Sequence, residues 1–324
     1  AKLFPLQQDL FDIGVMDEAS QMPVYNALGA LQRCKRVIIA GDEQQMNPTS
    51  YFQKGSKEII SVLHQANYSF RKLVLTHHYR SKHVPLIHFS NTNFYNNQLM
   101  VYPSFPVDFD CVKRHFCPTG KYIERKNLEE ATQVVKLIED KINSTKTIGI
   151  VAFSQNQVDA IWKLMPLELL EKVNQRIENR TLFIKPLEKV QGDECEHLII
   201  TLGYAVNEHG DFYMKFGPLN TASGRNRLNV LFSRASETID FVCSIESSVL
   251  KWSENESIQL LYKWLRSLAQ ENSKESIVFP LNLNPSINKN YLVFHNVHQS
   301  LPNAIELKTT YSILAARGWK IDFN

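Results

Sequence analysis

Two short apolar runs that end in acidic residues set the tightest limit on how this chain folds. Residues 11–16 (FDIGVM) lead into an Asp-Glu pair, and residues 36–40 (RVIIA) lead into a Gly-Asp pair. Runs of this length and composition are typical of buried strands in a parallel sheet. Residues 21–33 leave room for one short helix between them. This order predicts a doubly wound α/β sheet that binds its ligands at the carboxyl ends of the strands.

The rest of the chain repeats the alternation of strands and helices, which implies a second parallel sheet. Apolar runs predict three further strands, at residues 147–153, 197–202 and 238–243. Residue spacing predicts helices over 127–143, 157–170 and 256–270. Residues 50–76 predict a helix and a connector, and the Ser/Asn/Pro-rich stretch 271–290 predicts a linker before a tail element, 291–324.

Composition excludes several classes of protein. A chain of 324 residues suggests about two domains. No apolar run approaches the roughly 18 residues that a membrane span needs, so no membrane partner is expected. The net charge of +3 is compatible with a nucleic-acid partner without arguing for one. Five scattered cysteines without a C-x-x-C pair indicate neither a disulfide framework nor a zinc site, and they favour a reducing compartment, the cytoplasm.

Several polar residues at predicted strand ends and turns could carry phosphoryl chemistry. Asp17 could hold Mg²⁺, and Glu18 could polarise an attacking water. Gln45 could orient a water or sense a phosphate. The planar forks of Arg80 and Arg234 could stabilise phosphoryl charge. Taken alone, each residue is better explained as an acidic strand end, a polar turn or a solvated arginine.

The order and spacing of these segments are more specific than any one of them. In chain order they are VMDEAS (15–20), GDEQQMNP (41–48), LTHHYR (75–80), FSNTNFY (89–95), IGIVAF (148–153), QGDECE (191–196) and RLNVLFSRA (227–235). Together they resemble the superfamily 1 helicases of the nonsense-decay-helicase-like branch, and FGPLN at 216–220 is similar to the large bacterial DNA helicases of that branch. The resemblance covers residues 11–245, about three quarters of the chain.

The resemblance implies an α/β fold with RecA-like parallel sheets and flanking helices, in which two domains clamp ATP between them and bind single-stranded nucleic acid across their top. It implies that Asp17 holds Mg²⁺ and that Glu18 is the base for the attacking water. It further implies that Gln45 couples the γ-phosphate to the nucleic-acid site. Arg80 and Arg234 are then the arginines that reach the γ-phosphate from the second domain.

The resemblance also implies a nucleotide-binding turn. Gly192 opens it, Glu194 contacts the ribose, and Arg227 supports the cluster. The chain departs from the family pattern at His78, where a glutamine is usual before the Tyr-Arg pair. None of the departures removes a catalytic side chain.

One departure has a larger consequence, because the phosphate-binding loop G-x-x-x-x-G-K-[ST] is absent. The only Gly-Lys pair, Gly120-Lys121, lacks the rest of the pattern. We therefore expect the C-terminal part of a longer helicase, partnered by a missing N-terminal half of the motor. Residues 1–72 would end the first RecA-like domain, 73–250 would form the second, and 251–324 would be a small extension of unassigned role. This chain alone is expected not to hydrolyse ATP at a useful rate.

Three functions remain open at this point. The leading one is an ATP-dependent helicase that translocates on single-stranded nucleic acid, DNA rather than RNA. The second is a non-catalytic nucleic-acid-binding or partner-docking module that keeps the helicase fold. The third is a nuclease-helicase whose tail, with Glu306-Leu307-Lys308, cuts nucleic acid. The presence of Glu18, Arg80 and Arg234 favours the first, because a binding module does not need all three.

Overall fold

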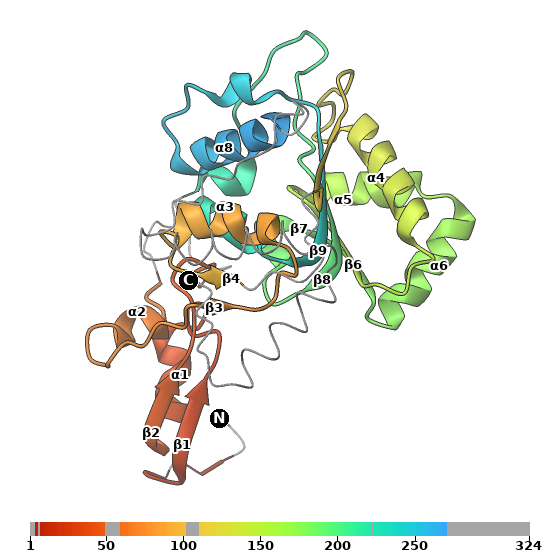
Figure 1. The fold of residues 1–324 in the computed structure, drawn as a ribbon. Coiled ribbons are helices and arrows are strands. Elements are labelled where there is room, and N and C mark those ends of the chain that lie inside the picture. Colours follow the sequence, from red (N-terminus) through yellow and green to blue (C-terminus); the bar gives the residue numbers. More distant parts are fainter. Residues whose placement is uncertain (1–3, 6, 49–58, 102–109, 222, 271–324) are drawn as a thin grey trace, which may run out of the picture.

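The computed structural model describes residues 4–5, 7–48, 59–101, 110–221 and 223–270. It contains a two-stranded parallel sheet near the N-terminus and a five-stranded parallel sheet in the larger part of the chain, with helices on both faces of the latter (Figure 1). The predicted linker and tail, and with them Glu306 to Lys308, lie outside the described residues.

The first sheet follows the predicted strand–helix–strand order. It consists of β1 (Phe11–Met16), α1 (Val24–Leu31) and β2 (Cys34–Ile39), with β1 and β2 paired in parallel. The short helix α2 (Val62–Ala66) is the described helix of the predicted 50–76 stretch, and it packs near α1 and β2. Its N-cap is Ser61, whose side chain accepts the His64 N–H, as helix N-caps commonly do.

The prediction that both of these strands are buried is wrong for the described part of the chain. Val15 is 67% exposed and Ile38 is 56% exposed. The core of this region is a small cluster of four buried residues, Met16, Ala19, Ala27 and Val62. Figure 1 shows β1 and β2, in red, projecting from the main body. The strands form as predicted, but little packs on them.

The second sheet has the strand order β5-β9-β8-β6-β7, and every pairing is parallel. Its strands are β5 (Val112–Phe116), β6 (Ile148–Ala152), β7 (Leu182–Pro186), β8 (Cys195–Thr201) and β9 (Ala235–Cys243). The three central strands match the predicted ones. The two edge strands were not predicted, because Lys113, Arg114 and His115 fill the middle of VKRHF and the apolar run in LFIKP is only three residues long. The α/β fold with a RecA-like parallel sheet and flanking helices is confirmed.

Helices cover the five-stranded sheet on both faces. On one face lie α4 (Leu128–Lys141), α5 (Gln155–Leu164) and α6 (Leu167–Glu178), and on the other lie α3 (Val84–Phe94), α7 (Gly224–Phe232) and α8 (Glu256–Gln270). Each set buries its own apolar cluster against the strands. Strands covered on both faces explain why the central runs are continuously apolar. The remaining elements are short: β3 (His77–His78), β4 (Met100–Val101), η1 (Leu187–Lys189), η2 (Gly217–Asn220) and η3 (Ser247–Leu250).

The single helix predicted over 157–170 is in fact two helices. Helix α5 ends at Leu164, and Met165 has an extended backbone with ψ of 129°. Pro166 then caps the start of α6. Proline lacks an N–H and disfavours helical backbone in the residue before it, so the chain turns at this point.

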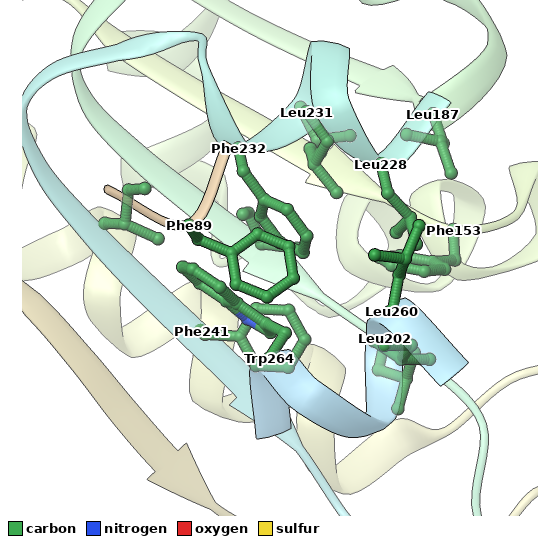
Figure 2. Packing of buried hydrophobic residues seen from close by; sticks show 14 of the residues in the cluster. Phe89, Phe153, Leu187, Leu202, Leu228, Leu231, Phe232, Phe241, Leu260 and Trp264 are labelled. Carbon is green, nitrogen blue, oxygen red and sulfur yellow. The ribbon is translucent and has the colours of Figure 1, made fainter. Parts of the chain in front are cut away.

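Helix α8, predicted over the same residues, packs directly on the core of the five-stranded sheet. Its Trp264 is 2% exposed and stacks on Phe232 of α7, with ring centroids 4.0 Å apart. Figure 2 shows the same indole beside Phe89 of α3 and Phe241 of β9. The division of the chain at residue 250 stays a prediction, and α8 shares the core of the residues before it. No helix in the described part of the chain combines the length and apolar character needed to cross a membrane.

Candidate functional site

The carboxyl end of β1 presents the predicted Asp17 and Glu18 side by side and exposed. Glu18 has a left-handed backbone, with φ of 52°, and its N–H donates to Asp17 Oδ1 at 2.8 Å. Gln21 Nε2 donates to Glu18 Oε2 at 2.9 Å. The neighbouring strand leaves through Gly41, where a Cβ would lie only 3.0 Å from the backbone nitrogen of Ser20. Glycine avoids this tight contact where the two strand ends approach each other.

The loop after β2 holds Gln45 in one orientation. Asp42 Oδ1 accepts the Gln44 N–H at 2.9 Å, and Asp42 Oδ2 accepts from Gln45 Nε2 at 3.1 Å. The bond to a carboxylate, which accepts only, fixes which end of the Gln45 amide faces Asp42. Gln45 therefore presents its carbonyl end away from Asp42.

The two predicted arginines both lie near Glu194. Arg80 forms an ion pair with Glu194 and donates to Ser233 O at 3.4 Å. Arg234 is 3% exposed and donates to Val230 O at 2.9 Å. Burial, and then the nearby Arg80 charge, lower the pKa of the Arg234 guanidinium, while Glu194 and Glu18 act in the opposite direction. A positive charge that is shielded from water stabilises a nearby anion more strongly than a solvated positive charge does.

The predicted Gly192 turn connects the two halves of this arrangement. Gly192 has φ of +85°, a conformation that glycine adopts at little cost. Beside it, Gln191 Nε2 donates to Glu18 Oε2 at 3.2 Å. The backbone oxygen of Asp193 accepts from Arg234 at 3.2 Å. The turn therefore contacts the acidic end of β1 on one side and the buried arginine on the other.

The structure thus brings together Glu18, Glu194, Arg80 and Arg234, which we call the charged cluster. It does not bring Arg227 to them. One Arg227 nitrogen donates to Pro218 O, to Thr221 Oγ1 and to Ser223 Oγ at 2.6–3.3 Å, so this buried side chain braces the start of α7 against η2. Its predicted support of the cluster stays a prediction.

Sequence reasoning assigned no role to a second set of polar residues beside Gln45. Tyr95, at the end of α3, donates its hydroxyl to Asp42 Oδ2 at 2.6 Å. Asn229 Nδ2 donates to this hydroxyl and to Gln44 O, and Asn226 Nδ2 donates to Glu43 O and Gln45 O. Tyr95 and Asn229 lie in the segments that carry the resemblance, and Asn226 lies directly before one of them. Sequence reasoning could not find these residues, because an amide or a phenol shows its role only through a partner that is distant in the sequence.

Among the described residues, no group of three or more His, Cys, Asp and Glu side chains is arranged to hold a metal ion. Mg²⁺ needs no such group, because it is commonly bound by one or two carboxylates together with waters and phosphate oxygens. Asp17 and Glu18 supply carboxylates of that kind at an exposed strand end.

Comparison with known proteins gives a family and a set of relatives. The family model described as AAA domain matches residues 56–246, more than half of the chain. Proteins named uncharacterized ATP-dependent helicases from Mycoplasma pneumoniae and Mycoplasma genitalium are each 34% identical over 269 residues. These matches cover 74% of this chain and 24% of each relative, so the chain spans about a quarter of their length. A protein of the same description from Methanocaldococcus jannaschii is 24% identical, over 82% of this chain and 40% of that protein.

Solved helicase structures are similar only at a distance. The PRRSV helicase is 11% identical with a TM-score of 0.36, over 71% of this chain and 34% of that one. The Arterivirus nonstructural protein 10 helicase in complex with DNA is 12% identical with a TM-score of 0.38, over 70% of this chain and 38% of that one. These structures are too distant to assign a family to the chain. The family follows from the matched family model, and the fold is seen in the five-stranded sheet.

Proposed function

The chain belongs to the AAA domain family, and on that premise we propose that it is the C-terminal part of an ATP-dependent helicase that uses ATP hydrolysis to move along single-stranded DNA. The observation that carries the proposal is the charged cluster, in which Glu18 from the end of β1 faces Glu194, Arg80 and Arg234 from the other part of the chain. Its chemistry matches phosphoryl transfer, where catalysis is mostly positioning and neutralisation of charge.

Each residue then has a role that its position supports. Asp17 holds Mg²⁺, which neutralises phosphate charge when bound. Glu18 accepts the proton of the attacking water, and Gln45 reports the state of the γ-phosphate. Arg80 and Arg234 stabilise the charge that develops on the transferred group. In this arrangement both arginines are held by protein oxygens, ready to exchange those partners for phosphate.

The ribose of the nucleotide is assigned to the Gly192 turn. Glu194 is more than half exposed and its ion pair with Arg80 lies at the surface of the cluster. An exposed carboxylate next to a positive-φ glycine is well suited to hydrogen-bond a ribose hydroxyl. Arg227 supports this turn indirectly, through the start of α7.

A partner for the N-terminal sheet is part of the proposal. The exposed apolar residues of β1 and β2 would be covered by further strands and helices of a longer polypeptide that includes the phosphate-binding loop. Relatives about four times as long as the matched segment are consistent with this. All five cysteines are free, which supports a reducing compartment such as the cytoplasm. DNA rather than RNA is proposed from the resemblance to large bacterial DNA helicases.

The test compares this chain with a polypeptide extended upstream to include the phosphate-binding loop. We expect ATP hydrolysis stimulated by single-stranded DNA only from the longer protein. Glu18→Gln in the longer protein should lower kcat by about 100-fold or more, because it removes the general base. The matched control is Glu171→Gln, an exposed carboxylate on α6, which should leave the rate unchanged.

The opposite results are equally informative. Hydrolysis by the shorter chain, abolished by Glu18→Gln, would contradict the proposal that it needs an upstream half. If neither protein hydrolyses ATP with any nucleic acid, and nucleic-acid binding does not depend on ATP, the helicase proposal would be wrong. The chain would then be a binding module with a helicase fold.

A further inference from the structure

The hydroxyl of Tyr95 lies where the loop after β2 meets helix α7. Tyr95 caps the C-terminal end of α3, so its backbone belongs to the five-stranded part of the molecule. Its hydroxyl donates to Asp42 Oδ2 at 2.6 Å and accepts from Asn229 Nδ2 at 2.8 Å. Burial and the Asp42 carboxylate both raise the pKa of the phenol, so it keeps the proton that it donates. A bond this short to a carboxylate is of the charge-assisted kind.

One oxygen of Asp42 serves two partners. Oδ2 accepts both from the Tyr95 hydroxyl and from Gln45 Nε2, while Oδ1 accepts the Gln44 N–H. The orientation of the Asp42 carboxylate therefore determines where the Gln45 amide points. The Tyr95 hydroxyl, bonded to the same oxygen as Gln45 Nε2, helps to fix that orientation.

Helix α7 holds the backbone of the same loop. Asn229 is fully buried and donates to Gln44 O at 2.9 Å. Asn226 donates to Gln45 O at 2.7 Å and to Glu43 O at 3.1 Å. The same helix leads into Arg234, whose Nε donates back to Val230 O within it. A shift of α7 therefore moves the Gln45 loop and Arg234 together.

We propose that Tyr95, Asp42 and Asn229 form a polar latch that couples the Gln45 loop to α7, and that Tyr95 is the positioning residue for Gln45. The role of Gln45 in hydrolysis rests on the function proposed above, whereas the latch itself rests on the contacts alone. Tyr95 touches no reacting group and acts through the Asp42 carboxylate. Its effect is to keep the phosphate-sensing amide and the buried arginine in a fixed relation.

The first experiment measures the latch without nucleotide. Hydrogen exchange of the Gln44 and Gln45 amides is compared in this chain, in Tyr95→Phe and in Tyr122→Phe. Tyr122 is another partly buried tyrosine, with a ring packed 5.2 Å from Tyr204, and serves as the matched control. Loss of a bond to a charged acceptor predicts exchange about tenfold faster in Tyr95→Phe and unchanged in Tyr122→Phe. Equal exchange in all three proteins would overturn the latch.

A double-mutant cycle guards against a variant that loosens the fold generally. Asp42→Asn weakens the same acceptor, so Tyr95→Phe should change exchange by less than about twofold when added to it. If the two effects instead multiply, the hydroxyl and the carboxylate act separately and the latch is contradicted. This comparison remains valid when Tyr95→Phe itself lowers the melting temperature.

The second experiment uses the longer protein that contains the phosphate-binding loop. Tyr95→Phe should lower kcat for DNA-stimulated ATP hydrolysis about tenfold and leave KM for ATP within about twofold, since only the position of Gln45 in the transition state is affected. A proportional change in KM, or an equal effect of Tyr122→Phe, would overturn the positioning role. Faster exchange combined with no hydrolysis by the unaltered longer protein would refute the proposed function and leave the latch standing.

Discussion

The N-terminal sheet β1-β2 and the five-stranded sheet are both parallel and both built largely from apolar runs, but they differ sharply in burial. In β6 every residue from Ile148 to Ala152 is buried. In β1, an apolar run interrupted only by Asp12, Met16 alone is buried. Strand β6 lies between two neighbouring strands and has helices on both faces, whereas β1 has one paired neighbour among the described residues. A short apolar run therefore specifies a strand, while burial is a property of whatever packs against it.

The largest expected effect comes from truncating the same residue type in the two sheets. Ile150 in β6 is 0% exposed and Ile13 in β1 is 57% exposed. Ile150→Ala should lower the free energy of unfolding by about 2–5 kcal/mol, from lost burial and the cavity left behind. Ile13→Ala should cost under about 1 kcal/mol, since little burial is lost. Urea unfolding followed by circular dichroism measures both.

The comparison would break if Ile13→Ala were as damaging as Ile150→Ala. That outcome would mean that the exposed face of β1 is covered in solution. Dilution of the protein over two orders of magnitude would then show whether a second copy provides the cover.

An intermediate effect is expected from pH in the segment that joins the two regions. His78 Nε2 accepts the Ser81 N–H at 3.1 Å, and burial followed by the Arg80 charge lowers the pKa of His78 to about 4. Because the unfolded chain binds this proton near pH 6.5, stability is complete above that pH and is lost as the pH falls from 6.5 to 4. Discounted for its partial exposure, the loss is about 1–2 kcal/mol.

His78→Gln should abolish this pH window, and urea unfolding at pH 7.5 and pH 5 measures it. His209→Gln, in an exposed loop, is the control and should leave the window unchanged. An unchanged window in His78→Gln would assign the acid sensitivity to another group.

The smallest effect is expected at the surface of the N-terminal sheet. Lys35 and Asp12 form an ion pair at 2.8 Å between β2 and β1, with side chains 56% and 87% exposed. Solvent screens such pairs, so Lys35→Ala should change the free energy of unfolding by less than about 0.5 kcal/mol. The measurement is unfolding at low and high salt. A larger, salt-dependent loss would mean that this sheet relies on charge where the larger one relies on burial.

The strands and helices with strong local signals were predictable from sequence. The apolar period of 127–143 and the run at 147–153 correspond to α4 and β6. The edge strand β5 was not predictable, because Lys113, Arg114 and His115 fill its middle and, among the described strands, it pairs on one side only. The break at Pro166 was readable in principle, since proline punctuates helices, but the apolar spacing on both sides obscured it.

The candidate site shows a similar division. Residue types and order were enough to single out Glu18, Arg80 and Arg234, which the fold brings together. Tyr95 was not identifiable as a partner of Asp42, because 53 positions separate them in the sequence and a phenol has no local signal. The contacts of Arg227 were equally hidden, since an arginine in a polar string does not reveal which way it points.

The left-handed backbone at Glu18 has a consequence for any selection experiment on this protein. A side chain there costs about 1 kcal/mol relative to glycine, which alone adopts such a conformation freely. A library screened only for folding should therefore enrich glycine at position 18. A library of the longer protein, screened for ATP turnover, should retain the glutamate despite its cost. The difference between the residues enriched at position 18 in the two screens would measure how much the carboxylate contributes to activity.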